Sequence, residues 1–270
     1  MIKNPDPYTT ILPLYNSKHP NLIHQLEEAK KVCINLEYEM VKRGYREANV
    51  YQLTPDNYDR QIEKIFRDKL VWLPINRVKK YNGYSHKHEF VENLSDDALV
   101  YGVIARDIET AEKFKKVQTS IDHIETAKLL GYPECCSLFF DKVFSQDMDP
   151  IWSSAINTEG NYIKNKILYV PHYNLLLLQH LRYFAPRIIS WFPCSFLCEE
   201  SSKKSKIWFS VLEDINPEIA SFIKEVLTVK GQTWDLHLAQ VNVDLPGYFR
   251  GIVSSYYTPE RRFIKFGEEE

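Results

Sequence analysis

Residues 98–117 read ALVYGVIARDIETAEKFKKV, and this stretch decides the fold class. Its first part, Ala98 to Ala105, is apolar and rich in residues that favour β-structure, which predicts a buried strand. Asp107 then stands where a helix N-cap is expected, and apolar residues recur after it at helical spacing. A strand that leads directly into a helix is typical of folds that mix both kinds of element.

Further helices and strands are expected on both sides of this unit. On the N-terminal side the sequence predicts helices over 21–43 and 55–68 and strands over 49–53 and 70–75. On the C-terminal side it predicts helices that begin at Asp122, Asn174 and Asn216, and strands over 188–191, 234–243 and 248–257. We therefore expect an α/β or α+β fold in a single mixed domain, with an N-terminal α/β region (1–95) and a cysteine-motif region (96–270) that can be continuous with it.

Composition argues against several classes of protein. The 270 residues include 34 basic and 36 acidic side chains, so a main role in binding nucleic acid or an anionic membrane is not expected. The apolar runs are far shorter than the roughly 20 residues that span a bilayer, and no secretory leader is evident near the start. We expect a cytoplasmic protein without a membrane segment, in which five cysteines serve metal binding or redox chemistry rather than a disulfide framework.

Four of the five cysteines fall into two short motifs. The first is GYPECC, residues 131–136, and the second is PCSFLC, residues 193–198. A proline precedes the cysteines in each motif and a helical pattern follows, so Pro133 and Pro193 are expected at the first position of a helix. Both motifs would then lie at helix N-termini, where unpaired backbone N–H groups and the helix dipole stabilise thiolates.

Cys135, Cys136, Cys194 and Cys198 are therefore the candidate ligands of one metal centre. Cys194 and Cys198 are four residues apart and would share one face of a helix. Cys135 and Cys136 are adjacent, so in a regular helix their side chains diverge by about 100°, which disfavours a small mononuclear ion. We favour an iron–sulfur cluster of the 4Fe-4S type, held by all four thiolates or by three with one iron open. Structural zinc and unligated thiols are the alternatives.

The two motifs together, Leu130–Cys136 and Phe192–Cys198, resemble those of an uncharacterised prokaryotic family of unknown function with GYPxCC and PCSxxC motifs. This resemblance implies no activity. The adjacent cysteines also resemble those that bind the terminal cluster in the small quinone-side subunit of respiratory complex I and those of epoxyqueuosine reductases with a tandem cysteine pair. That parallel implies only that adjacent cysteines can share one cluster.

Two functions of different classes follow from the cysteines. The first is an enzyme that binds or reduces a small polar substrate at the cluster, with an electron donor protein as a further partner. The second is a non-enzymatic protein in which a zinc site joins two helices and the surface binds a macromolecular partner. His172, Glu134 and Glu199 are weak candidates for catalytic groups, because they lie between or beside the motifs but are equally suited to structural roles at helix starts.

Overall fold

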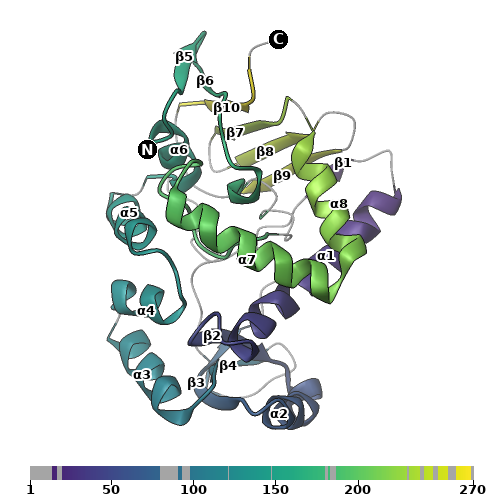
Figure 1. Ribbon diagram of the computed structural model, residues 1–270, viewed down its shortest axis with the longest axis vertical. Coiled ribbons are helices and arrows are strands. Elements are labelled where there is room, and N and C mark those ends of the chain that lie inside the picture. Colours follow the sequence, from purple (N-terminus) through teal and green to yellow (C-terminus); the bar gives the residue numbers. More distant parts are fainter. Residues whose placement is uncertain are drawn as a thin grey trace.

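Two β-sheets and the helices packed on them make up the protein in the computed structural model (Figure 1). The predicted mixed α/β fold class is thereby confirmed. The described residues are 14–16, 20–79, 91–92, 98–120, 122–146, 148–179, 182, 187–229, 231–237, 240–245, 249–254 and 260–268.

The smaller sheet is built around the predicted buried strand. Its order is β2 (Ala48–Leu53), β4 (Ala98–Ala105) and β3 (Val71–Lys79), and all pairs are antiparallel. Side chains alternate along β4, so one face packs against α2 (Tyr58–Arg67) and the other against α3 (Ile108–Thr119), which Asp107 caps as predicted. A short 3-10 turn, η1 (Pro55–Asn57), leads into α2.

A glycine in the centre of this sheet has a clear packing reason. A Cβ atom at Gly102 would collide with the ring of Trp72, a residue of the neighbouring strand β3. Trp72 is buried and belongs to the hydrophobic cluster on the α2 face of the sheet. Gly102 therefore makes room for a large aromatic side chain between two hydrogen-bonded strands.

The larger sheet has seven strands within the described residues, in the order β1-β9-β8-β7-β10-β6-β5. All neighbours are antiparallel except β10 and β6. The strands are β1 (Leu14–Asn16), β5 (Tyr162–Lys164), β6 (Ile167–Val170), β7 (Thr233–His237), β8 (Gln240–Leu245), β9 (Phe249–Ser254) and β10 (Arg262–Phe266).

Three helices pack beside this sheet in one large hydrophobic core: α1 (Pro20–Lys42), α7 (Glu199–Ile215) and α8 (Pro217–Thr228). The long helix α1 contributes to both sheets' cores, because Leu36 and Met40 lie in the large core whereas Tyr38 and Val41 lie in the core beneath the small sheet. Between the sheets in sequence come α4 (His123–Leu129), α5 (Glu134–Ser145) and α6 (Pro150–Ile156). In Figure 1, α3, α4 and α5 form a column along one side.

Outside the cysteine motifs, the structure differs from the sequence prediction in three places. Residues 174–184 were expected to be a helix, but their described part contains no α-helix and includes the 3-10 turn η2 (Leu175–Leu177). The reason is that Leu177 and Leu178 are both buried, so this run is core packing without the polar face of a surface helix. Residues 188–191 form no strand, and residues 234–243 form parts of two strands, β7 and β8, rather than one.

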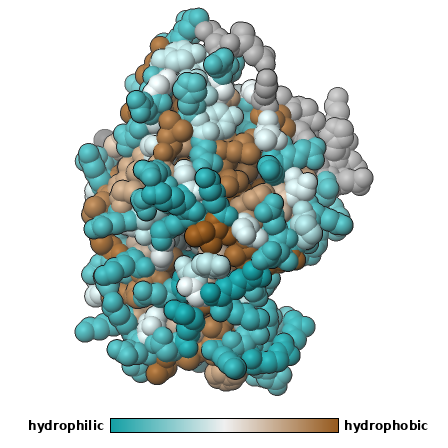
Figure 2. All heavy atoms as spheres, viewed as in Figure 1, coloured by the Kyte–Doolittle hydropathy of each residue, from teal (hydrophilic) through white to brown (hydrophobic). Residues whose placement is uncertain are grey.

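Two further expectations concern the chain as a whole. The boundary at residue 95 stays a prediction; β4, just beyond it, is the central strand of the small sheet. No helix within the described ranges combines the length and apolar character needed to cross a bilayer. The face in Figure 2 is mostly hydrophilic, with apolar side chains between the polar ones. Scattered apolar residues are normal on protein surfaces.

Candidate metal centre

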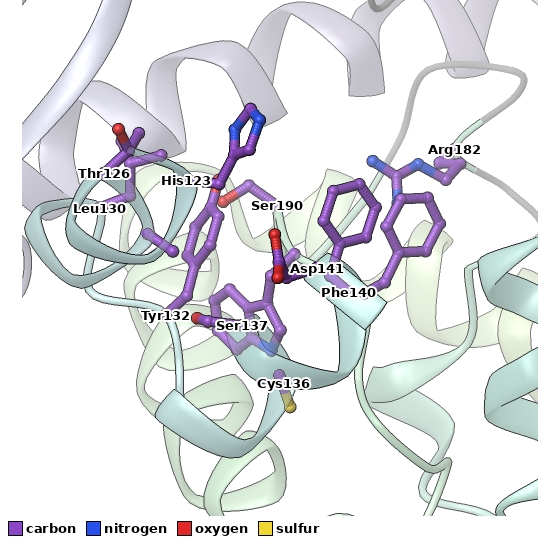
Figure 3. A pocket seen from close by; sticks show the side chains of 13 residues that line it. His123, Thr126, Leu130, Tyr132, Cys136, Ser137, Phe140, Asp141, Arg182 and Ser190 are labelled. Carbon is purple, nitrogen blue, oxygen red and sulfur yellow. The ribbon is translucent and has the colours of Figure 1, made fainter. Parts of the chain in front are cut away.

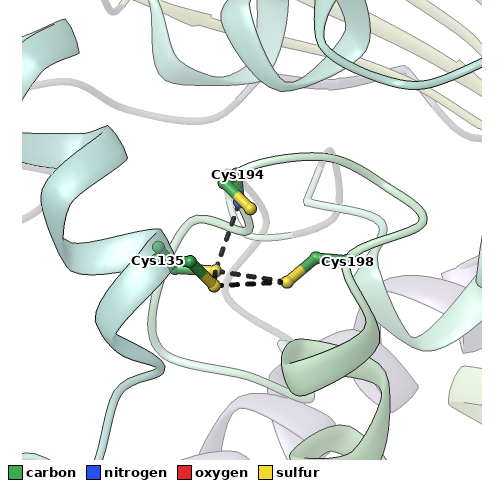
Figure 4. Close-up of side chains that lie close together, drawn as sticks. Cys135, Cys194 and Cys198 are labelled. Atoms are coloured by element: carbon green, nitrogen blue, oxygen red, sulfur yellow. Dashed lines mark hydrogen bonds between the residues drawn. The ribbon is translucent and has the colours of Figure 1, made fainter.

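The two cysteine motifs come together in space, 58 to 63 residues apart along the chain (Figure 4). The four Sγ atoms all lie within 4.8 Å of one another. The Sγ atom of Cys198 is 3.7 Å from those of both Cys135 and Cys136, which are themselves 3.8 Å apart. This group of four thiols could hold a metal ion.

The first pair is positioned by a sharp turn between two helices. Gly131 has a φ of +71°, a conformation that ends α4 and is easy only for glycine. Pro133 then precedes the first residue of α5, with φ −61° and ψ 135°. Cys135 and Cys136 consequently lie in the first turn of α5, where backbone N–H groups lack helical partners.

The sulfur atoms of the adjacent cysteines lie close together, although the sequence spacing predicted that the two side chains would diverge. The expected angle of about 100° separates Cβ directions only, and side-chain rotation about χ1 still brings the two sulfur atoms of Cys135 and Cys136 to 3.8 Å. The argument that adjacent cysteines disfavour a single ion is therefore wrong for this site.

The second pair is held by a loop, not by a helix that starts at Pro193 as predicted. Helix α7 begins at Glu199, and Cys198 is its N-cap, with Sγ accepting from the N–H of Ser201 at 3.5 Å. Cys194 lies before the helix, and its N–H donates to Sγ of Cys136 at 3.3 Å. The physical reason is that backbone N–H groups of this segment bond to other parts of the chain, Cys194 to Cys136 Sγ and Phe196 to Thr158 Oγ1, and are thereby held outside a helix.

Three polar contacts from α6 and the two residues after it fix this loop. Ser154 Oγ donates to the carbonyl oxygen of Pro193 at 2.6 Å, and the N–H of Phe196 donates to Thr158 Oγ1 at 2.9 Å. Asn157 Nδ2 donates to the carbonyl oxygen of Cys194 at 3.3 Å. Ser154 and Thr158 are almost completely buried, so these hydrogen bonds are shielded from water.

A buried hydroxyl connects the centre to a tryptophan. Ser201, which is fully buried, lies with Oγ 3.1 Å from Sγ of Cys136 and accepts a hydrogen bond from Trp191 Nε1 at 2.9 Å. Because the indole can only donate, the hydroxyl hydrogen of Ser201 is available to the sulfur. A hydrogen bond of this kind favours a thiolate at Cys136.

The metal-free site cannot ionise all its thiols together. Hydrogen bonds from Cys136 and Cys194 hold the pKa of Cys198 well below its ordinary value. The same contacts with Cys194 and Cys198 raise the pKa of Cys136. Adjacent negative charges repel one another. The favoured arrangement is therefore one thiolate, at Cys198, that accepts hydrogen bonds from protonated neighbouring thiols. A bound cation would displace the remaining protons.

The four sulfurs differ in their access to water. Cys136 and Cys198 are buried, Cys194 is half-buried and Cys135 is exposed. The centre therefore lies near the surface, with its Cys135 side towards solvent. Lys204 Nζ supports the opposite motif by donating to the carbonyl oxygen of Gly131 at 2.8 Å.

The other candidate residues lie outside this group of sulfurs. His172 is exposed and lies beside Gly160, and it is not part of the group of ligand atoms. Glu134 is exposed at the start of α5. Glu199 pairs with Lys203 at 2.8 Å, and this hydrogen bond lowers the pKa of Glu199. Their catalytic roles stay predictions.

A cavity of about 280 Å³ adjoins the centre (Figure 3). Its walls come from α4, α5, Arg182 and residues 190–192, and they include Cys136. This cavity was not predicted from the sequence. The sequence pattern that could have indicated it is the concentration of aromatic residues in and beside the two motifs, but aromatic residues are equally suited to a filled core.

No family model, no curated protein and no solved structure matches the chain. The resemblance of the two motifs to a prokaryotic family stays a prediction. Function must therefore be argued from the geometry of the cysteine centre.

Proposed function

We propose that Cys135, Cys136, Cys194 and Cys198 bind one zinc ion. We further propose that the chain is a binding protein, and that this ion holds the walls of the adjoining cavity in place. The distances between sulfur atoms support this most directly. Ligands about 2.3 Å from a tetrahedral zinc ion lie about 3.8 Å from one another. The three separations among Cys135, Cys136 and Cys198 are 3.7 to 3.8 Å.

Four thiolates around one ion leave no coordination position for substrate, which is typical of structural zinc. The ion would fasten the first turn of α5 to the Pro193–Cys198 loop and the start of α7. It would also fix Cys136 and the residues before Cys194, which belong to the walls of the cavity. These observations favour a binding role over a reaction at the metal.

An iron–sulfur enzyme that binds or reduces a small polar substrate is the second candidate. The exposure of Cys135 favours it, because an exposed ligand can be exchanged for substrate and one iron left open. Each thiolate of a four-iron cluster binds a different iron, so its sulfurs lie farther apart than sulfurs that share one ion. The Pro193–Cys198 loop would have to move outward to accept such a cluster.

Purification without oxygen, followed by metal analysis, acid-labile sulfide analysis and a visible spectrum, separates these functions. Zinc at one equivalent per chain in a colourless, sulfide-free protein is the expected result. A brown protein with iron and stoichiometric sulfide would replace the zinc proposal by the cluster enzyme. A single iron without sulfide would also contradict zinc.

The fifth cysteine provides a matched control. Cys33 is buried in the large core on α1 and lies outside the group of four sulfurs. Cys33→Ala should keep the full metal content, whereas serine at any of the four ligand positions should lower zinc affinity. Equal zinc affinity in Cys33→Ala and all four serine variants would show that the cysteine group is not the binding site.

A further inference from the structure

The cavity beside the cysteine centre has the size of a small-molecule site. Its volume of about 280 Å³ is near the lower end of the roughly 300–1,000 Å³ typical of such sites. Figure 3 shows side chains from several separate segments of the chain pointing into it. A cavity of this size suits a ligand with one ring and a few polar groups.

Two aromatic pairs form much of its wall. Tyr132 and Trp191 have ring centroids 5.5 Å apart and planes tilted by 40°. Phe140 and Phe192 are stacked, with centroids 5.5 Å apart and planes only 2° from parallel. Because Phe140 and Arg182 already lie against the ring of Phe192, these pairs favour a flat aromatic group mainly through apolar and edge contacts.

The polar groups of the cavity carry opposite charges at different depths. Arg182 is 7% exposed, lies 3.8 Å over the ring of Phe192 and donates to Gln179 Oε1 at 2.9 Å. Asp141 is exposed on α5, and the described residues offer it no ion-pair or hydrogen-bond partner. The cavity thus has a fixed positive group in a buried position and a carboxylate at its rim.

One further polar group of the cavity is available to a ligand. Ser190 Oγ is buried and has no hydrogen-bond partner in the described part of the chain, so it can donate to a ligand.

We propose that this cavity binds a zwitterionic aromatic molecule of the amino-acid class. The ring lies against the two aromatic pairs, the carboxylate faces Arg182 and Ser190, and the ammonium group faces Asp141. A ligand with only a carboxylate would be repelled by Asp141, and a ligand with only an amine would meet the buried positive charge of Arg182. Cys136 lines both this cavity and the metal centre, but the contacts assigned to the ligand are made by other residues, so the inference goes beyond the proposed zinc function.

Calorimetric titration of the metal-loaded full chain with three probes of the same ring tests the proposal. The probes are L-phenylalanine, 3-phenylpropionate without the ammonium group, and 2-phenylethylamine without the carboxylate. L-phenylalanine should bind at least about tenfold more tightly than either of the others, a difference of ~1.4 kcal/mol. Equal binding of all three, tighter binding of 3-phenylpropionate, or no binding of any probe at millimolar concentration would overturn the proposal.

Single replacements test which side chain of the cavity contacts the ammonium group of the ligand and which contacts its carboxylate. Asp141→Asn should weaken L-phenylalanine about tenfold and leave 3-phenylpropionate no weaker, because only the ammonium contact is lost. Ser190→Ala should weaken both probes that carry a carboxylate and spare 2-phenylethylamine. Asp59→Asn, on exposed α2, is the matched control and should change nothing.

Zinc content, measured in each sample, keeps this test separate from the metal centre. A variant that retains zinc but loses L-phenylalanine supports the cavity site directly. A retained preference for L-phenylalanine over 3-phenylpropionate in Asp141→Asn would refute the assigned role of that carboxylate. A chain that binds L-phenylalanine as expected but contains no zinc would leave the cavity proposal intact and refute the zinc function alone.

Discussion

Replacing Ser201 by alanine should weaken metal binding although Ser201 is not a ligand. The replacement removes the hydroxyl that lies 3.1 Å from Cys136 Sγ and accepts from Trp191 Nε1 at 2.9 Å. A hydrogen bond to a charged group contributes about 1.5–3 kcal/mol, and an indole N–H left buried without a partner costs about 1–3 kcal/mol. The first effect acts on the metal-bound thiolate and the second on the folded chain.

These magnitudes translate into two separate measurements. Competition for zinc with a chromophoric chelator should show affinity lower by about 10- to 100-fold, the usual effect of losing a partner that orients a ligand. Denaturant unfolding of the zinc-loaded chain should show a free energy of unfolding lower by about 2.5–6 kcal/mol, because both effects are lost.

A matched serine on the same helix controls for the replacement itself. Ser210 is exposed on α7, and Ser210→Ala should change neither quantity. Zinc affinity in Ser201→Ala within about twofold of the unmodified chain would refute the reasoning, since a hydrogen bond to the thiolate is worth more than that. A lower free energy of unfolding with unchanged zinc affinity would show that Ser201 stabilises the fold through Trp191 and does not affect the metal ligand.

Three further predictions follow from other parts of the structure. Cys136→Ser should lose more zinc affinity than Cys135→Ser in chelator competition, because Cys136 is buried and receives two further hydrogen bonds whereas Cys135 is exposed; equal losses would contradict this. Burial raises the pKa of Asp149 from about 4 to about 7. A raised carboxyl pKa stabilises the fold at low pH, so the free energy of unfolding should fall as pH rises from about 4 to about 7, by up to ~4 kcal/mol. Asp149→Asn, which keeps an acceptor for the helix N-cap, should flatten this profile in denaturant titrations at pH 5 and pH 8, and an unchanged slope would refute the assignment. Gly102→Ala should lower the thermal midpoint, with a cost of about 1–3 kcal/mol from overpacking against the ring of Trp72 and the carbonyl oxygen of Leu73, and an unchanged midpoint would refute this packing argument.

Local signals in the sequence were sufficient for much of the fold. The apolar run of β4, the cap Asp107 and the cap Asn216 each act within a few residues, so their structural effects can be derived from neighbouring positions alone. The same holds for the four cysteines as a group, because two compact motifs in one chain are rarely unrelated.

Features that depend on distant partners were not predictable in this way. The Pro193 motif looks like a helix start, but contacts from Ser154 and Thr158 hold it as a loop. The approach of Cys135 to Cys136 depends on rotamers that only the completed site selects. The cavity likewise depends on which aromatic faces remain uncovered once α4, α5 and residues 190–192 have packed.

The cysteine centre also closes a long loop in the chain. Cys135 and Cys198 are 63 residues apart in sequence, and the segment between them contains α6, β5, β6 and η2. Bringing the ends of such a loop together costs an unfolded chain about 4 kcal/mol of entropy by the logarithmic length rule. An ion that binds only the folded chain stabilises it in proportion to the logarithm of the free ion concentration. With zinc as that ion, the folded fraction of this protein becomes a measure of zinc supply.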